Sequence, residues 1–393
     1  MGVSEDVKMK YELMDMCSDG AVIKVIGVGG GGGNAVDHMI ESHIDSVQFI
    51  GANTDAQALR RLNVETKIQL GIELTKGLGA GTRPEIGKLA AEENKDHLRE
   101  VIEGADMVFL TAGMGGGTGT GAISVIAEVA KEMGVLTVAV VTKPFDFEGK
   151  KKKSVAEEGI RELEKYVDSL IIIPNQKLLP VLGGNLSVTN AFKAANDVLL
   201  DAVQGITELI THPGLINVDF ADVKTVMANM GAAIMGSGSA TGENRAREAA
   251  EKAIACPLLE DINLQGAKGI LVNVTAADMG LTEFDEIGSI MQAFASEDAD
   301  MKIGMATNPD MGDEIKVTVV ATGMGGSVTA SNAPVKLIQK AAAGDINYDV
   351  LDKPTVIRQS KQEPRETRFG AQPKSDVDLD YLDVPAFLRR QAD

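Results

Sequence analysis

The sequence has no tryptophan and few other aromatic residues, with 10 phenylalanines and 4 tyrosines among 393 residues. Its only cysteines are Cys17 and Cys256. Two cysteines are too few for a disulfide framework or a structural zinc site, which favours a reducing, cytoplasmic compartment. No apolar run reaches the ~20 residues of a membrane-spanning helix, and residues 1–20 lack the apolar core of a signal peptide. We therefore expect a soluble protein with no direct membrane insertion.

Positive charge is also scarce, since 38 Lys and Arg face 57 Asp and Glu, giving a net charge of −19. A protein that binds nucleic acid through the phosphate backbone needs a basic face, so the composition argues against a nucleic-acid partner. The hydrophobic fraction of 44% is ordinary for a globular protein, and the length favours more than one domain.

Short apolar segments alternate with helical patterns over the first half of the chain. The strand-like segments are residues 21–26, 47–52, 106–111, 135–141 and 169–173. This alternation predicts βαβ units and a Rossmann-like, mainly parallel sheet, so the fold class is α/β. Two expected helices, residues 86–102 and 122–133, lie between these strands.

A long helix follows, with Ser187 as its expected N-cap and apolar residues at helical spacing up to His212-Pro213. A smaller α/β domain is expected after it, with helices at 221–230 and 244–255 and strands at 269–275 and 315–321. Beyond it the composition becomes polar, with eight basic and five acidic residues in 330–375, which is typical of a flexible linker. The expected organisation is an N-terminal extension (1–20), a first domain (21–186), a central helix (187–211), a loop (212–222), a second domain (223–328), a disordered linker (329–375) and a C-terminal peptide (376–393).

Two glycine-rich segments each lie between an expected strand and an expected helix. The first, Gly27–Asn34, offers bare backbone amides beside a helix N-terminus, which predicts an anion site. It also fits G-x-G-x-x-G, the dinucleotide fingerprint, and Asp55 could then be the ribose-binding acid of a nicotinamide-dependent oxidoreductase. The second, Gly113–Gly121, has six glycines in nine residues and no following lysine, so it is not a Walker A loop. Two such phosphate loops suit a polyphosphate better than a nicotinamide cofactor.

The second glycine segment resembles the tubulin-family signature G-G-G-T-G-T-G. Together with four other segments it makes the chain similar to the FtsZ family, the bacterial cell-division branch of the tubulin-like GTPases, and the tail is most like that of proteobacterial members. The similarity runs from about residue 21 to 328 and resumes at 378. The other four segments are Gly29–Asn34, Asn53–Ala56, Asn217–Asp222 and Asp380–Asp393.

The resemblance implies that the first domain binds GTP or GDP with Mg²⁺ and that subunits polymerise head-to-tail into filaments. Such filaments scaffold the division ring at midcell, beneath the inner membrane, and act in septation. The phosphates would be held by backbone amides and the Thr118 hydroxyl, the ribose region by Glu148 and Lys152, and guanine by Asn34, Asn175, Phe192 and Asn196. The implied nucleotide-binding residues are Gly30, Gly31, Gly32, Gly33, Asn34, Gly117, Thr118, Gly119, Glu148, Lys152, Asn175, Phe192 and Asn196. No side chain is identified as a metal ligand.

Two of these positions depart from the family pattern. Relatives usually have arginine where Lys152 stands, and lysine keeps the charge but loses the planar guanidinium fork. Many have aspartate where Asn196 stands, and an asparagine offers only one carbonyl to the two N–H donors of guanine. Asp197 or a water could supply the second acceptor.

A polar loop after the long helix carries Asn217, Asp219 and Asp222. Two carboxylates three residues apart can bind a cation and orient a water, although on the sequence alone Asp222 reads more simply as a helix N-cap. The resemblance implies that this loop is catalytic and acts in trans, on the γ-phosphate held by the next subunit of a filament.

The C-terminal peptide gathers apolar side chains among aspartates and arginines. The resemblance implies that it binds membrane-tethering adaptors of the FtsA and ZipA type and other division regulators, whereas a chance apolar cluster in a disordered end is the alternative. The tail also argues against a tubulin-like filament protein that acts outside division. The expected partner-binding residues are Tyr381, Leu382, Val384, Phe387 and Leu388.

Overall fold

The computed structural model describes residues 20–44, 46–182, 187–211, 216, 218–259, 267–296 and 299–324. All of them belong to the unit Met1–Ala330, the first of the two compact units into which the chain divides. The expected N-terminal extension up to residue 19, the linker 329–375 and the peptide 376–393 lie outside the described residues, and the domain boundaries remain a prediction.

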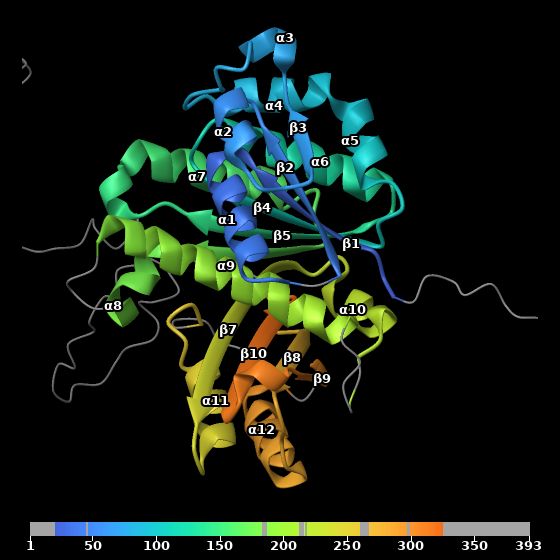
Figure 1. The fold of residues 1–393 in the computed structure, drawn as a ribbon, viewed down its shortest axis with the longest axis vertical. Helices are drawn as coiled ribbons and strands as arrows, with labels where there is room; N and C mark the ends of the chain where they lie inside the picture. Colours follow the sequence, from blue (N-terminus) through green and yellow to red (C-terminus); the bar gives the residue numbers. More distant parts are fainter. Residues whose placement is uncertain are drawn as a thin grey trace, which may run out of the picture. The chain divides into compact units, whose positions relative to one another are not determined.

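The first half alternates strands and helices as the sequence pattern predicts (Figure 1). Its elements are β1 (Ile23–Val28), α1 (Gly29–Glu41), β2 (Val47–Asn53), α2 (Ala56–Arg61), β3 (Thr66–Gln69), α3 (Ile72–Thr75), α4 (Pro84–Glu93), α5 (Lys95–Ile102), β4 (Met107–Gly113), α6 (Thr118–Glu132), β5 (Leu136–Lys143), α7 (Lys150–Leu163), β6 (Ser169–Pro174) and α8 (Leu179–Leu182). The second half comprises α9 (Val188–Thr211), α10 (Phe220–Met227), β7 (Gly231–Thr241), α11 (Arg245–Ile254), β8 (Gly269–Ala276), α12 (Leu281–Phe294), β9 (Asp300–Thr307) and β10 (Glu314–Thr322).

The strands follow the order β3-β2-β1-β4-β5-β6-β7-β10-β8-β9. Pairing is parallel from β3 through β6, as expected for an α/β fold, whereas β10 runs antiparallel to both β7 and β8. Strand β7 joins the two halves, because Gly231–Ala233 pairs with β6 and the rest of the strand pairs with β10. The α/β class is therefore confirmed, with a mixed second half.

Helix α9 confirms the predicted central helix, and the backbone N–H of Asn190 donates to the Ser187 hydroxyl at 3.2 Å, as expected of an N-cap. Its buried face joins a core that contains Val140 from β5 and both Leu271 and Val320 from the second half. One helix thus packs on both halves of the sheet, and Figure 1 shows it running between them.

The sequence pattern was wrong about several elements. The expected helix 86–102 is two helices, α4 and α5, separated at Asn94. The helix expected at 221–230 is confirmed but is shorter, Phe220–Met227. Strand β7 was missed because it consists mainly of glycine, alanine and serine, which have low strand propensity. Those small residues let α11 approach closely, since a Cβ added to Gly236 would lie 2.2 Å from the Ala253 carbonyl oxygen.

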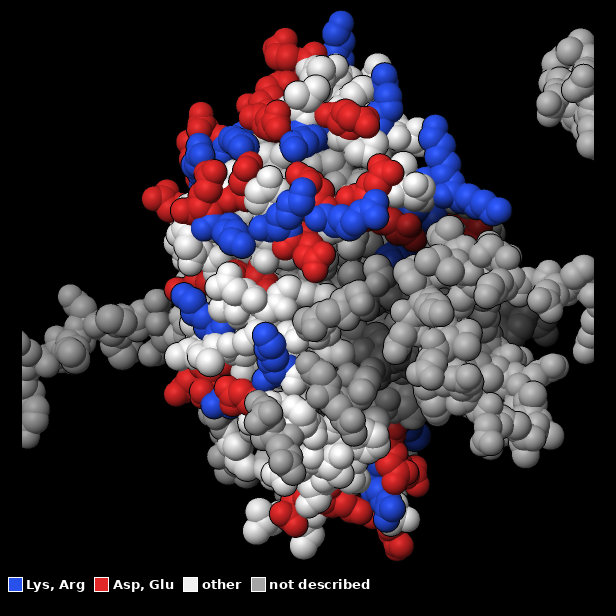
Figure 2. All heavy atoms as spheres, turned by 180° about the vertical axis from the view of Figure 1, so that it is seen from behind, with Lys and Arg blue, Asp and Glu red and all other residues white. Residues whose placement is uncertain are grey.

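Charges of both signs are interspersed on the face of the molecule shown in Figure 2. Ion pairs link α5 to α6, where Lys95 lies 2.6 Å from Glu128 and Arg99 lies 2.9 Å from Glu132. The hydrogen bond to Glu128 raises the pKa of Lys95. The surface charge there is consequently balanced locally. Among the helices that the structure describes, none is long and apolar enough to cross a membrane.

Candidate nucleotide and catalytic site

A cavity of about 300 Å³ opens where the parallel strands end. Gly113 at the end of β4, Thr142 near the end of β5 and Asn175 after β6 all line it, as do residues of α1 and α9. The carboxyl ends of parallel strands are the usual ligand site of open α/β sheets. Eleven of the thirteen residues expected to bind nucleotide lie around this one cavity: Gly30, Gly31, Asn34, Gly117, Thr118, Gly119, Glu148, Lys152, Asn175, Phe192 and Asn196.

The other two expected residues, Gly32 and Gly33, do not line the cavity. The glycine run is not a loop but the beginning of α1, which starts at Gly29. Helical geometry turns Gly32 toward β4, where an added Cβ would lie 2.2 Å from the Thr111 carbonyl oxygen, and Gly33 toward Leu62. Gly32 therefore permits close packing of α1 on the sheet, and Gly33 leaves room for the Leu62 side chain.

Two helix N-termini converge on the cavity, because α1 begins at Gly29 and α6 begins at Thr118. Neither helix has an acidic residue in its first turn. A Cβ added to Gly30 or to Gly116 would meet no atom within 4 Å, so the backbone there is open to an incoming group. Free N–H groups at helix N-termini favour anions, and the bare backbone lets phosphate oxygens approach closely.

Other glycines of the second segment serve packing instead. A Cβ on Gly121 would lie 1.9 Å from the Pro84 carbonyl oxygen, and a Cβ on Gly117 would lie 2.6 Å from that of Gly81. Gly81 also lines the cavity, and its carbonyl oxygen accepts a hydrogen bond from the Gly117 backbone N–H at 3.0 Å. Sequence reasoning missed Gly81, although Gly77, Gly79 and Gly81 alternate in the sequence and all three adopt positive φ.

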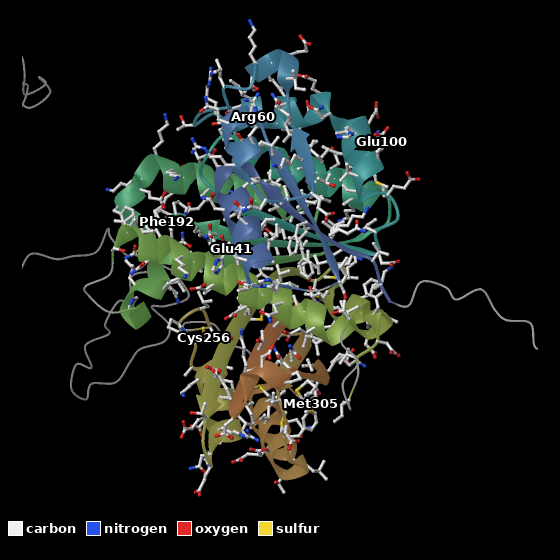
Figure 3. The ribbon with its side chains drawn as sticks, in the orientation of Figure 1. Glu41, Arg60, Glu100, Phe192, Cys256 and Met305 are labelled. Carbon is white, nitrogen blue, oxygen red and sulfur yellow. The ribbon has the colours of Figure 1, made fainter. Side chains whose placement is uncertain are left out.

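The cavity lining also contains an unsatisfied polar group. Asn175 is 3% exposed, and its side-chain oxygen Oδ1 has no hydrogen-bond partner among the described residues. A buried acceptor without a donor is costly, so a ligand with N–H groups fits this position. Phe192 is 41% exposed and contacts Phe145 edge-to-face, with ring centroids 5.3 Å apart. An aromatic face and a buried amide acceptor suit a purine base with N–H donors, such as guanine. Figure 3 marks Phe192 on α9.

The charged side chains at the cavity are already paired. The Lys152 ammonium lies 2.5 Å from the Glu148 carboxylate, which also accepts a hydrogen bond from the Phe145 backbone N–H at 2.9 Å.

The Thr118 and Thr54 hydroxyl oxygens lie 2.6 Å apart, so one donates to the other. The suggestion that Asp197 assists Asn196 is not supported, because its carboxylate pairs with His38 at 2.6 Å and does not line the cavity.

Asp55 does not behave as a free ribose-binding acid. Its carboxylate accepts hydrogen bonds from the backbone N–H groups of Gln57, at 2.8 Å, and Ala58, at 3.1 Å, and so caps α2. The geometry thus gives no support to the nicotinamide alternative.

The expected catalytic acids lie at the other end of α9 from the guanine-binding candidates. Asp219 occupies the N-cap position of α10 without a side-chain cap bond, and Asp222 lies in the first turn, so the reading of Asp222 as the N-cap is wrong. Neither lines the cavity, and Asn217 lies outside the described residues. Helix α9 has 24 residues, and the stretch from Asn196 to Thr211 alone spans about 22 Å at 1.5 Å per residue. The structure therefore separates the acids from the cavity within one subunit.

No side-chain metal site accompanies the cavity in the part of the chain that the structure describes, where no group of three or more His, Cys, Asp or Glu could hold an ion.

Comparison with known proteins gives the family of the chain. The family model for the GTPase domain of the Tubulin/FtsZ family matches residues 22–183, and the model for the C-terminal domain of the FtsZ family matches residues 231–325. The cell division protein FtsZ of Coxiella burnetii is 59% identical over 97% of this chain and 99% of its own length. The protein of that name from Pseudomonas aeruginosa is 56% identical over 98% of this chain and 100% of its own length.

Solved structures show the same relationship. An FtsZ dimer from M. jannaschii has a TM-score of 0.75 at 43% identity and covers 78% of this chain and 89% of its own. The GTPγS-bound protofilament of CetZ2 from Haloferax volcanii, at 18% identity and a TM-score of 0.65, covers 76% of this chain and 92% of its own and supports the fold alone. The cavity at the strand ends, the two family models and the nearly full-length relatives lead to one conclusion: this chain is a GTP-binding GTPase that belongs to the tubulin/FtsZ family.

Proposed function

We propose that subunits of this protein assemble head-to-tail, and that each contact brings the Asn217–Asp222 loop of one subunit to the GTP bound by its neighbour. The observation that supports this most directly is the separation of the acids from the cavity along α9. In a lone subunit the acids lie away from the bound nucleotide, whereas a head-to-tail contact brings the acids of one subunit to the nucleotide of the next. Because such a contact is heterologous and does not close, it repeats into a filament.

The proposal assigns roles in nucleotide binding to residues that line the cavity. Backbone N–H groups of the first turns of α1 and α6 bind the phosphates, and Thr118 adds a hydroxyl. Asn175 accepts from the guanine N–H groups, Asn196 assists, and Phe192 packs on the base. Glu148 and Lys152 lie where the ribose and phosphates meet, and Mg²⁺ supplies charge neutralisation at the phosphates.

The loop acids act on the water. Asp219 and Asp222 of the adjacent subunit accept hydrogen bonds from the attacking water and orient it in line with the bond to the leaving phosphate oxygen. Hydrolysis then removes the γ-phosphate from the contact and weakens it, which gives turnover of the filament.

The proposal predicts one threshold for assembly and catalysis. Phosphate release and light scattering should both rise above the same protein concentration in GTP, whereas GDP should support no stable assembly. Catalysis by separate subunits would instead give a rate proportional to concentration from the lowest value tested. Both signals can be followed in a single dilution series of the full chain.

We further propose that the filament scaffolds the bacterial division ring at midcell, as the names of its relatives suggest, and that the C-terminal peptide links it to the inner membrane. Residues 376–393 lie outside the described residues, so the support is their sequence, in which apolar side chains including Leu382, Phe387 and Leu388 stand among charges. An adaptor of the FtsA or ZipA type would bind them.

Deleting Asp380–Asp393 tests this link. Assembly in solution should remain at the parental threshold, because all the residues proposed to bind or hydrolyse GTP precede residue 223 in the sequence. Recruitment to vesicles coated with an FtsA- or ZipA-type adaptor should be lost in a flotation assay. Parental recruitment of the truncated chain would show that the apolar residues of the tail are incidental.

A further inference from the structure

Lys302, on β9, contacts the proposed catalytic region. Its Nζ lies 3.1 Å from Asp222 Oδ1 and 3.6 Å from Asp300 Oδ1. Its side chain is 31% exposed, so the ammonium is partly shielded from water. A lysine ammonium is charged at neutral pH, and the hydrogen bond to Asp222 raises the pKa of Lys302 further. A fixed cation therefore lies beside an acid that has to face a polyphosphate.

Strand β9 also contacts the residues just before Asp222. The Met305 backbone N–H donates to the Ile216 carbonyl oxygen at 3.0 Å. Gly304 leaves room for the Val218 side chain, since an added Cβ would lie 2.9 Å from it. Lys302 and Gly304 share one face of the strand because side chains alternate. Strand β9 is the last strand in the sheet order, so its free edge is available to this segment, and Figure 3 labels Met305 on it.

Three aspartates lie on the two elements that meet here, Asp219 and Asp222 at the start of α10 and Asp300 on β9. Asp219, Asp222 and Asp300 are all exposed or nearly so, and Lys302 is the cation that contacts two of them. A triphosphate that approaches three carboxylates is repelled, and the repulsion is weaker when an ammonium lies between them. The same contact restricts the directions in which the Asp222 carboxylate can point.

We propose that Lys302 is a positioning residue for the reaction between subunits. Its ammonium orients the Asp222 carboxylate and offsets the negative charge that this surface presents to the triphosphate of the neighbouring subunit. This inference rests on the proposed function, because it assigns Lys302 a role only where the acid loop meets a nucleotide in trans.

The experiment uses three variants of the full chain, Lys302→Met, Lys302→Arg and Lys252→Met. Lys252 is the matched control because it too is a lysine in the second half of the fold and is paired with a carboxylate, that of Glu248 at 3.7 Å. It lies on α11, away from the acid loop. For each variant, the assembly threshold and the phosphate release per assembled subunit are measured at about 50 and about 300 mM salt, where screening lengths differ by more than twofold. Melting temperature and nucleotide affinity below the threshold are recorded for each.

At the lower salt, Lys302→Met should raise the assembly threshold by about two- to fivefold, the range that one partly exposed ion pair can supply. Phosphate release per assembled subunit should fall as well, because Asp222 is no longer held. The difference in threshold should shrink at the higher salt, where the carboxylates are screened. Lys302→Arg should remain within about twofold of the parent because it keeps the charge, and Lys252→Met should match the parent.

Two results would overturn the inference. One is a Lys302→Met variant that assembles and hydrolyses GTP at or above the parental level, which would make Lys302 neutral or inhibitory. The other is an equal defect in Lys302→Met and Lys302→Arg that salt does not change, which would indicate a purely structural role. Failure of the proposed function would give a different result. Asp222→Ala would then hydrolyse GTP at the parental rate, irrespective of the results for the Lys302 variants.

Discussion

Asp222→Ala should reduce GTP hydrolysis by at least about 100-fold, the lower range expected when a group that positions the reacting water is removed. Nucleotide binding should stay close to the parental level, because Asp222 does not line the cavity. Phosphate release is measured well above the assembly threshold, and affinity for a fluorescent GTP analogue is measured well below it. The variant thus separates binding by one subunit from catalysis by two.

Asp96→Ala provides the control for loss of an exposed aspartate. Asp96 lies on α5, where its side chain is 98% exposed and lies 3.1 Å from Arg99. Its removal should leave the rate of hydrolysis per assembled subunit unchanged. Parental hydrolysis by Asp222→Ala, or loss of nucleotide binding in that variant, would be incompatible with an acid that acts in trans.

The second large effect is expected at Gly116, where the cavity floor is bare. A Cβ there meets no atom within 4 Å, and its φ lies outside the left-handed region, so a side chain can be added there without a clash at Cβ or strain in the backbone. The added methyl groups would occupy the space that phosphate oxygens enter. Gly116→Val should weaken GDP and GTP binding by about 5- to 150-fold, corresponding to the ~1–3 kcal/mol that overpacking a filled site costs. Titration calorimetry with GDP measures the change.

Gly121→Ala is the informative comparison for Gly116→Val. Its Cβ would lie 1.9 Å from the Pro84 carbonyl oxygen, so α4 and α6 would have to move apart and the melting temperature should fall. Gly116→Val should keep the parental melting temperature in the absence of nucleotide. If Gly116→Val bound GDP as tightly as the parent, the phosphates would not lie over Gly116.

These two glycines also show what could be predicted from the sequence. The strand–glycine–helix pattern correctly indicated that helices begin at or beside the two glycine segments, because glycine density and helix position are local features. It could not separate glycines that face a ligand from those that face a carbonyl of another element. Gly32 packs against Thr111 and Gly121 packs against Pro84, and such contacts depend on the tertiary arrangement.

The distinction between local sequence features and tertiary contacts also applies to the rest of the molecule. Helix α9 was predictable because an apolar stripe and a serine cap are encoded within one segment. Strand β7 was not, because its small residues suit the approach of α11 rather than strand propensity. Most of the cavity residues were expected through resemblance to the family, whereas the contact between Lys302 and Asp222 joins distant segments and left no signal in the sequence.

The most direct test of the account mixes two variants at a GTP concentration that saturates Asp222→Ala but is too low for Gly116→Val to bind, so that neither variant alone hydrolyses GTP. Asp222→Ala retains an intact cavity, and Gly116→Val retains an intact acid loop, so a contact between the first variant's nucleotide and the second variant's loop contains every required group. If equal amounts of the two variants join at random, about one quarter of the head-to-tail contacts are of this kind. Light scattering confirms co-assembly while phosphate release is measured across mixing ratios. The account predicts that hydrolysis reappears in the mixture and is greatest near equal amounts; co-assembled filaments without hydrolysis at any ratio would contradict it.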